Sequence, residues 1–252
     1  MRTFEEYERI LQLWERGFNK LAISQITDIP RATVRNCIDK FETVANLEEY
    51  RSQHPSLRET NVSITMWSPE YRAAYAYLLG LYLGDGHISH VRNSHRLRIS
   101  LDQRQPNILK RCVETVELIM PDKQVSINKT PSECVVVSCY TNRWLDLLPQ
   151  HGKGEKHTRK IELTDWQQTI WREYPLEFFR GLYHSDGARI EPVIYNRVYP
   201  RYQFTQVSTD IQRLFAETCD LLGLHYTFWG RNFTIAKRKD VAFLDEHIGP
   251  KS

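Results

Sequence analysis

The feature that most constrains the fold is an internal repeat. The segment YLLGLYLGDG at 77–86 returns as FFRGLYHSDG at 178–187, half a domain further along the chain. Aligned on Asp85 and Asp186, the copies agree at Gly80/Gly181, Leu81/Leu182, Tyr82/Tyr183 and the closing Asp-Gly. A chain that repeats a helical segment in this way predicts two similar halves packed around a common axis.

The segments that come after the two copies also resemble each other. In both halves the hydrophobic period changes from 3.6 to 2 and back, which predicts helix–strand–strand–helix–strand–strand–helix. The expected fold class is α+β: a duplicated αββαββα domain with pseudo-twofold symmetry, over residues 69–252. The first repeat is predicted over about 70–150 and the second over about 172–250.

Small residues four apart suggest how the two repeated helices meet. Gly80 and Gly84 in one helix, and Gly181 and Ser185 in the other, allow two backbones to approach closely. Helices packed through these residues place Asp85 and Asp186 together at their C-terminal ends.

Two carboxylates in that position repel each other and oppose both helix dipoles, so a further partner is needed. Hard divalent cations such as Mg²⁺ take carboxylate, carbonyl and water oxygens. Asp85 and Asp186 are therefore predicted to have a chemical role. The alternative is that each Asp-Gly merely ends a helix with a solvated acid.

Residues 1–45 predict a small all-α DNA-binding domain. Two short helices are followed by the turn DIP and a third helix, RATVRNCIDKF, that buries Val34, Ile38 and Phe41. Its outward residues are of the types that contact bases and phosphates: Arg31, Thr33, Arg35, Asn36 and Lys40. The pattern resembles resolvase-type helix-turn-helix proteins, except that Asp28 occupies a turn position where many of them have glycine. A small helical bundle with a merely solvated face is the alternative.

Residues 46–68 mix charge, Pro55 and small polar residues without a period, and we interpret them as a linker with one extra helical turn at most.

The double motif and the repeated topology resemble the LAGLIDADG homing endonucleases over roughly residues 70–250. HGKGEKHTRKIEL at 151–163 and the ending HIGPK resemble free-standing bacterial members that join a helix-turn-helix to this domain. The resemblance implies a site-specific, metal-dependent endonuclease that makes double-strand breaks in DNA at a long, near-asymmetric target.

The resemblance also implies a catalytic set. Asp85 and Asp186 are expected to bind Mg²⁺ or Mn²⁺, with the carbonyls of Gly84 and Ser185 as further ligands. Gln103, Gln206 and Lys156 are candidates for the surrounding polar network, where a lysine can stabilise a negative transition state. The alternative for Gln103 is a helix-start residue, and the alternative for Lys156 is a plain phosphate contact.

The two strand pairs are expected to lie in the major groove. The first carries His87, Ser89, Arg92, Asn93, His95, Arg96 and Arg98. The second carries Arg189, Glu191, Tyr195, Asn196, Arg197, Arg201 and Gln203. Lys153 in the connecting loop completes the DNA-contacting set. Charge that serves only solubility is the alternative.

Composition limits the other possibilities. The net charge of +3 points only weakly to a polyanionic partner, and no apolar stretch is long enough to span a membrane. The five cysteines are scattered, so reduced thiols in a cytoplasmic, bacterial-like and nucleoid-associated protein are expected. Zinc held by His87, His151, His157 or His184 matches no usual ligand spacing.

With both half-sites in one chain, a monomer without an obligate protein partner is expected. A transcriptional regulator that keeps the fold for binding alone is the main alternative, since a sporulation-regulator family joins a degenerate LAGLIDADG-like domain to a helix-turn-helix. An RNA maturase is a third possibility.

Overall fold

The computed structural model describes residues 4–53, 64–130 and 133–252. The chain divides into two compact units, Met1–Asn61 and Val62–Ser252, and each is considered by itself.

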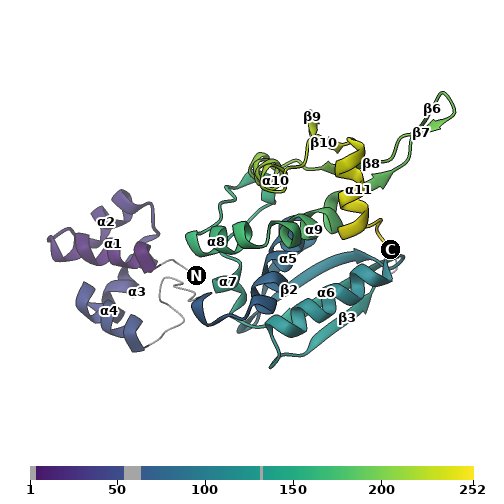
Figure 1. The fold of residues 1–252 in the computed structure, drawn as a ribbon. Coiled ribbons are helices and arrows are strands. Elements are labelled where there is room, and N and C mark those ends of the chain that lie inside the picture. The colour runs from purple at the N-terminus through teal and green to yellow at the C-terminus, as the bar shows by residue number, and fades with distance from the viewer. Residues whose placement is uncertain (1–3, 54–63, 131–132) are drawn as a thin grey trace. The chain divides into compact units, whose positions relative to one another are not determined.

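The N-terminal unit is all α-helical in its described part (Figure 1). Its helices are α1 (Phe4–Glu15), α2 (Lys20–Thr27), α3 (Arg31–Phe41) and α4 (Val44–Gln53). One apolar cluster holds them together: Ile10, Leu11, Ile23, Ile29, Val34, Cys37, Ile38, Phe41 and Leu47. The three inward residues predicted on α3 all lie in this core.

Local interactions fix the turns of this unit. The Asn19 side chain caps α2 by accepting hydrogen bonds from the backbone N–H groups of Leu21 and Ala22, at 3.1 and 3.0 Å. Asp28 ends α2 in the left-handed conformation, with φ 55°. This is the conformation that glycine adopts without strain and that aspartate tolerates better than most residues.

The predicted linker is partly wrong. Residues 44–53 form helix α4, and Leu47 is buried in the core of the N-terminal unit. The helix has almost no amphipathic period, so the sequence pattern did not reveal it. Residues 54–63 of the predicted linker lie outside the described residues, and a 3-10 turn at Ile64–Met66 precedes the repeats.

The C-terminal unit contains the duplicated αββαββα order. The first half is α5 (Pro69–Asp85), β1 (Gly86–Val91), β2 (Ser94–Asp102), α6 (Pro106–Ile119), β3 (Val125–Lys129), β4 (Cys134–Tyr140) and α7 (Trp144–Leu147). The second half is α9 (Pro175–Asp186), β5 (Gly187–Ile190), β8 (Arg201–Thr205), α10 (Thr209–Leu221), β9 (Thr227–Trp229), β10 (Asn232–Ile235) and α11 (Arg238–His247). The connection between them contains a 3-10 turn, Lys156–Thr158, and α8 (Asp165–Glu173).

Each half forms an antiparallel four-stranded sheet of the same topology. The strand orders are β1-β2-β4-β3 and β5-β8-β10-β9, and a single apolar core joins both halves. The second half differs by an inserted ribbon, β6 (Val193–Ile194) and β7 (Arg197–Val198), which extends from its sheet (Figure 1). Its two-residue turn, Tyr195-Asn196, has both φ angles positive, as a tight hairpin requires.

Helices α5 and α9 cross at their glycines, as predicted. A Cβ atom added to Gly80 would lie 2.5 Å from the Phe178 carbonyl oxygen and 2.9 Å from the Gly181 Cα. Every residue of α5 from Tyr75 to Leu83 is buried, because α9 covers one side and the first sheet and α6 cover others. The backbones are in contact, so these positions have no room for a side chain.

No helix in the described part of the chain is long and apolar enough to cross a membrane.

Replacing Gly80 by alanine tests this contact. In an open helix the change stabilises by about 1 kcal/mol. Here the added methyl group overlaps backbone atoms of α9, so we expect the free energy of unfolding to fall by about 1–3 kcal/mol. Chemical denaturation followed by tryptophan fluorescence measures it. Gly181→Ala is the matched variant on the other helix, and a gain in stability for either would contradict the backbone contact.

Candidate active site

The two motif acids lie where the crossing helices end. Asp85 is the last residue of α5 and Asp186 the last of α9, and a glycine follows each as the chain enters a sheet. A Cβ atom added to Gly84 would lie 2.8 Å from the Asp186 Oδ2 atom, so one acid lies directly beside the other helix. The glycine contact therefore brings the two carboxylates into one partly buried cluster, as predicted.

Both carboxyl groups ionise less readily than free aspartate. Burial, followed by repulsion from Asp186, raises the pKa of Asp85 to about 6. Burial also raises the pKa of Asp186. Lys156 and Lys251 act in the opposite direction on both acids but do not cancel the effect of burial. The site thus favours any additional positive charge near these oxygens.

Two lysines form a symmetric pair around the acids. The Lys156 Nζ atom donates to the carbonyls of Tyr82 and Gly84, the latter at 2.6 Å, and lies 5.1 Å from the centre of the Tyr82 ring. The Lys251 Nζ atom donates to the Ser185 carbonyl at 2.7 Å and lies 5.9 Å from the Tyr183 ring. Each lysine therefore binds the carbonyl just before one motif acid.

Lys251 was missed in the sequence. The available signal was that a Gly-X-Lys sequence follows the last helix of each half, as Gly154-Glu155-Lys156 and as Gly249-Pro250-Lys251. Burial lowers the pKa of Lys156 to about 8 and also lowers that of Lys251, while the two acids favour the charged form of each.

The two backbone carbonyls predicted as metal ligands bind lysine side chains instead. The oxygens of Gly84 and Ser185 each accept a hydrogen bond from a lysine ammonium group. A cation at either oxygen would lie against that ammonium group, so the structure does not support these two carbonyls as metal ligands. These lysine–carbonyl hydrogen bonds join residues far apart in the sequence, so the motif alone could not predict them.

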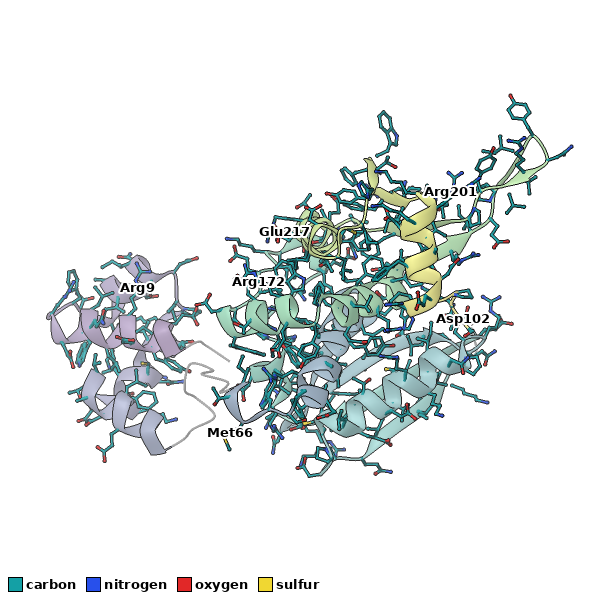
Figure 2. All side chains as sticks on the ribbon, viewed as in Figure 1. Arg9, Met66, Asp102, Arg172, Arg201 and Glu217 are labelled. Carbon is teal, nitrogen blue, oxygen red and sulfur yellow. The ribbon has the colours of Figure 1, made fainter. Side chains whose placement is uncertain are left out.

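Each acid lines its own cavity. One cavity, of about 410 Å³, is lined by Asp186, Gln206, Lys156, Gly84 and His87 among others. The second, of about 500 Å³, is lined by Asp85, Lys251, Ser185, Asp102 and Gln105 among others. Figure 2 shows Asp102 at the end of β2, close to the C-terminal segment that carries Lys251. Each cavity thus combines the acid of one motif with the lysine bound to the other.

The two predicted glutamines differ. The Gln206 Nε2 atom donates to Asp186 Oδ2 at 2.9 Å, which places it at the site. Gln103 occupies the same position at the end of its strand, with its backbone N–H bonded to the Glu133 carbonyl. Its side chain is exposed and does not line the Asp85 cavity, where Gln105 is found instead. The structure thus does not place Gln103 at the site.

The acids fit a hard divalent cation in donor chemistry, since they offer carboxylate oxygens whose burial lacks full compensation. No group of three or more His, Cys, Asp or Glu side chains is arranged for a metal among the described residues. Water and substrate oxygens would complete the coordination. Of the histidines considered for zinc, His184 is held by the Tyr77 hydroxyl at 2.9 Å, and burial lowers its pKa to about 3.

The outer face of the first sheet carries part of the predicted DNA-contacting set. Leu97 and Ile99 on β2 belong to the core, so Arg96 and Arg98 point to the opposite face. Their partners on β1 are Ser89 and His87, and Arg92 and Asn93 form the hairpin turn. His95 lies instead on the core side, where its ring contacts His90 and bonds to Asn142 at 2.9 Å.

The second sheet corrects the prediction for Arg189. Arg201 and Gln203 lie on its outer face, because Tyr202 and Phe204, which alternate with them along β8, are buried. Arg189 pairs with Tyr202 in the ladder and so faces α11, where it bonds to Asp245 at 2.6 and 3.0 Å. Glu191 forms an ion pair with the same arginine. The structure therefore does not place Arg189 among the groups available to DNA, whereas Glu191 remains exposed.

The other predicted contacts lie at the surface. Tyr195, Asn196 and Arg197 are exposed on the β6–β7 ribbon, with Tyr195 96% exposed, and Lys153 is exposed in the connecting loop. On α3, Arg31, Arg35, Asn36 and Lys40 are exposed, whereas Thr33 is half-buried.

Known structures share this architecture. The homing endonuclease I-DmoI, solved in complex with DNA and Mn, matches with a TM-score of 0.50 and 14% identity, over 71% of this chain and 97% of that one. The complex of I-DmoI with DNA and Ca matches equally, over 90% of its chain. The N-terminal LAGLIDADG domain of WhiA matches at 0.45 and 16% identity, over 75% of this chain and 87% of that one. No protein-family model and no curated protein sequence matches this chain.

The raised pKa of Asp85 predicts a pH-dependent stability. Its pKa in the folded state, about 6, exceeds the ordinary 3.8, so folding binds a proton between these values and stability falls as pH rises from about 4 to about 6. In metal-free buffer, we expect Asp85→Asn to raise the free energy of unfolding by about 2 kcal/mol at pH 7.5 and to change it little at pH 4.

Asp245→Asn is the matched control. Its hydrogen bond with Arg189 holds the pKa of Asp245 below the ordinary value, so stability from this group is present at neutral pH and lost as pH falls. That variant should therefore be destabilised at pH 7.5. Equal effects of Asp85→Asn at both pH values would contradict the assignment.

Proposed function

We propose that this chain, which has the LAGLIDADG fold, is a site-specific DNA-binding protein and a divalent-metal-dependent endonuclease. The observation that carries the proposal is the pair of partly buried acids at the ends of two helices in backbone contact, each beside a partly buried lysine. The structural likeness to I-DmoI, whose complexes contain DNA with Mn or Ca, is consistent with it.

The acids have a direct part in this reaction. A bound divalent cation lowers the pKa of its water, orients the attack and stabilises the leaving oxygen of a phosphodiester. Asp85 and Asp186 would hold Mg²⁺ or Mn²⁺ through their carboxylates. Since each acid lines a separate cavity, each cavity would receive the scissile phosphate of one strand of a duplex.

Lys156 and Lys251 supply positive charge next to where a scissile phosphate would lie. Ammonium groups fixed by backbone carbonyls and aromatic rings are already oriented, so they can stabilise the extra negative charge of the transition state without reorganising. Gln206, bonded to Asp186, holds that carboxylate in place and can orient water in the same cavity.

The outer faces of the two sheets are the proposed DNA-contacting surfaces. They carry Ser89, Arg96 and Arg98 on one side and Arg201 and Gln203 on the other, next to the acids in both cases. A two-stranded ribbon or sheet of this width enters the major groove. One chain that holds both halves would act as a monomer on a target without exact symmetry.

The N-terminal unit is proposed to bind DNA as a helix-turn-helix. The turn between α2 and α3 is short, and α3 exposes Arg31, Arg35 and Asn36 along one side. A helix of this composition can dock in the major groove with its N-terminal residues at the bases. It would lengthen the recognised sequence beyond the part read by the sheets.

A second candidate function is a regulator that binds DNA without cutting it. The observation in its favour is that the two lysine charges balance the two acid charges at the site, so the cluster is neutral without a metal. Cleavage and binding must therefore be measured separately.

The deciding experiment is cleavage of a randomised duplex library in Mg²⁺ or Mn²⁺. We expect the native protein to cut a defined sequence, and Asp85→Asn/Asp186→Asn to bind that sequence without cutting it. Asp122→Asn/Asp220→Asn removes the same charge at exposed positions and should cut normally. Selective binding without cleavage by the native protein would favour the regulator, and absence of selective binding would refute both.

Lys251 provides a separate test of the chemistry. Lys251→Met should lower the single-turnover cleavage rate at saturating protein by about 100-fold or more while changing the Kd for the target little. Lys153→Met, in the exposed loop, should weaken binding slightly and leave the saturated rate unchanged. A loss confined to Kd in Lys251→Met would show that this lysine is only a phosphate contact.

A further inference from the structure

The two sheets offer different chemistry to the same place on DNA. Counted from the glycine after each motif acid, the ladders are in equal register, since Gly86 pairs with Ile99 and Gly187 with Phe204. Arg96 on β2 and Arg201 on β8 are therefore equivalent. Both halves have an arginine at this point, so this position does not distinguish them.

The two halves do differ at the next outward-facing position along each sheet, which lies nearer to the acids. We call the residues paired across the strands at this position a row. In the first sheet, His87 on β1 lies opposite Arg98 on β2. In the second, Ala188 on β5 lies opposite Gln203 on β8, and Thr234 on β10 pairs with Gln203 from the other side. An arginine between His87 and Ser138 in one half thus corresponds to a glutamine between Ala188 and Thr234 in the other.

These side chains are available for recognition. Arg98 and Gln203 each lie on the outer face between buried neighbours, and within the described residues neither side chain forms a hydrogen bond. By contrast, Arg96 already donates to the Ser138 hydroxyl at 3.1 Å, and Arg189 is fixed by Asp245. In the row next to the acids, Arg98 and Gln203 therefore have polar groups that are free to bind a base.

The chemistry of base edges assigns a preference to each row. Arginine pairs best with the O6 and N7 atoms of guanine, whereas glutamine pairs with the N6 and N7 atoms of adenine. Small apolar groups such as the alanine and threonine methyls favour the methyl group of thymine. Ala188, Gln203 and Thr234 together therefore suit A·T pairs, and Arg98 suits a G·C pair.

We propose that the inner base pairs of the two half-sites differ in kind, with guanine read by Arg98 in one half and an A·T pair read by Gln203, with Ala188 and Thr234, in the other. This inference rests on the proposed binding of duplex DNA by the sheets. It gives the target a direction, since the chain then binds in only one of two orientations.

The test is selection of bound duplexes from a randomised library, in EDTA so that no product is lost by cleavage. Native protein, Arg98→Gln and Gln203→Arg are compared, each as the full chain. We expect Arg98→Gln to move one position from guanine to adenine, and Gln203→Arg to move a position in the other half from adenine to guanine. Each preference should change by about ten-fold or more.

Two further variants separate base reading from charge and from folding. Arg98→Lys keeps the positive charge but removes the guanidinium group that can donate two parallel hydrogen bonds to guanine. It should therefore weaken the guanine preference at the same position. Arg213→Gln removes the same charge from exposed α10 and should leave every base preference unchanged.

The outcomes are distinct. If the native protein selects a sequence but these variants change only overall affinity, or if both inner positions prefer guanine, the inference is wrong and the proposed function stands. If the native protein selects no duplex sequence, the inference and the proposed function both fail.

Discussion

The contact between Gly80 and Gly181 is the constraint on which the C-terminal unit depends. Since the two helix backbones touch, neither helix can slide or rotate without overlap. The sheets start directly from the ends of these helices, so the crossing also fixes the spacing between the two outer faces. A short stretch of backbone thereby sets both the position of the acids and the geometry of the surfaces beside them.

The same crossing creates an electrostatic cost. It brings two carboxylates together at the negative ends of two helix dipoles and removes much of their water. Two lysines from distant parts of the chain partly offset this cost by placing positive charge near the carboxylates. Lys156 lies in the connection between the halves, and Lys251 follows α11. Their own burial lowers their pKa values, so all four groups are held away from their ordinary ionisation behaviour.

Much of the fold could be predicted because the two copies of the repeat independently indicate the same order of helices and strands. Two copies of a helical motif followed by the same alternation of periods leave few arrangements, and the αββαββα order was confirmed. The acids lie together as predicted, because the glycine spacing specifies which helix faces meet. Helix α4 was not predicted, because its apolar residues have no helical period; among its described side chains Leu47 is buried in the core and Val44 packs against it.

The remaining site residues depended on information that is absent from local sequence. Whether Arg189 faces DNA or α11 depends on strand register, and a shift of one residue reverses the face. The inserted β6–β7 ribbon separates β5 from its partner β8, so their pairing could not be inferred from the hairpin spacing of the first repeat. The Lys251 contact joins parts of the chain 66 residues apart, and the Gly-X-Lys sequence does not show which carbonyl the lysine reaches.

Gly84 and Ser185 make the interface between the halves unequal. The Ser185 side chain occupies the space that a Cβ atom on Gly84 would need. Two copies of the second half would bring serine against serine and collide, and two copies of the first would leave a gap. A homodimer must present the same patch to itself, whereas a fused chain is free of that requirement. The covalent link thus allows the two halves to be complementary instead of identical, and the helix crossing itself discriminates between correct and incorrect pairing.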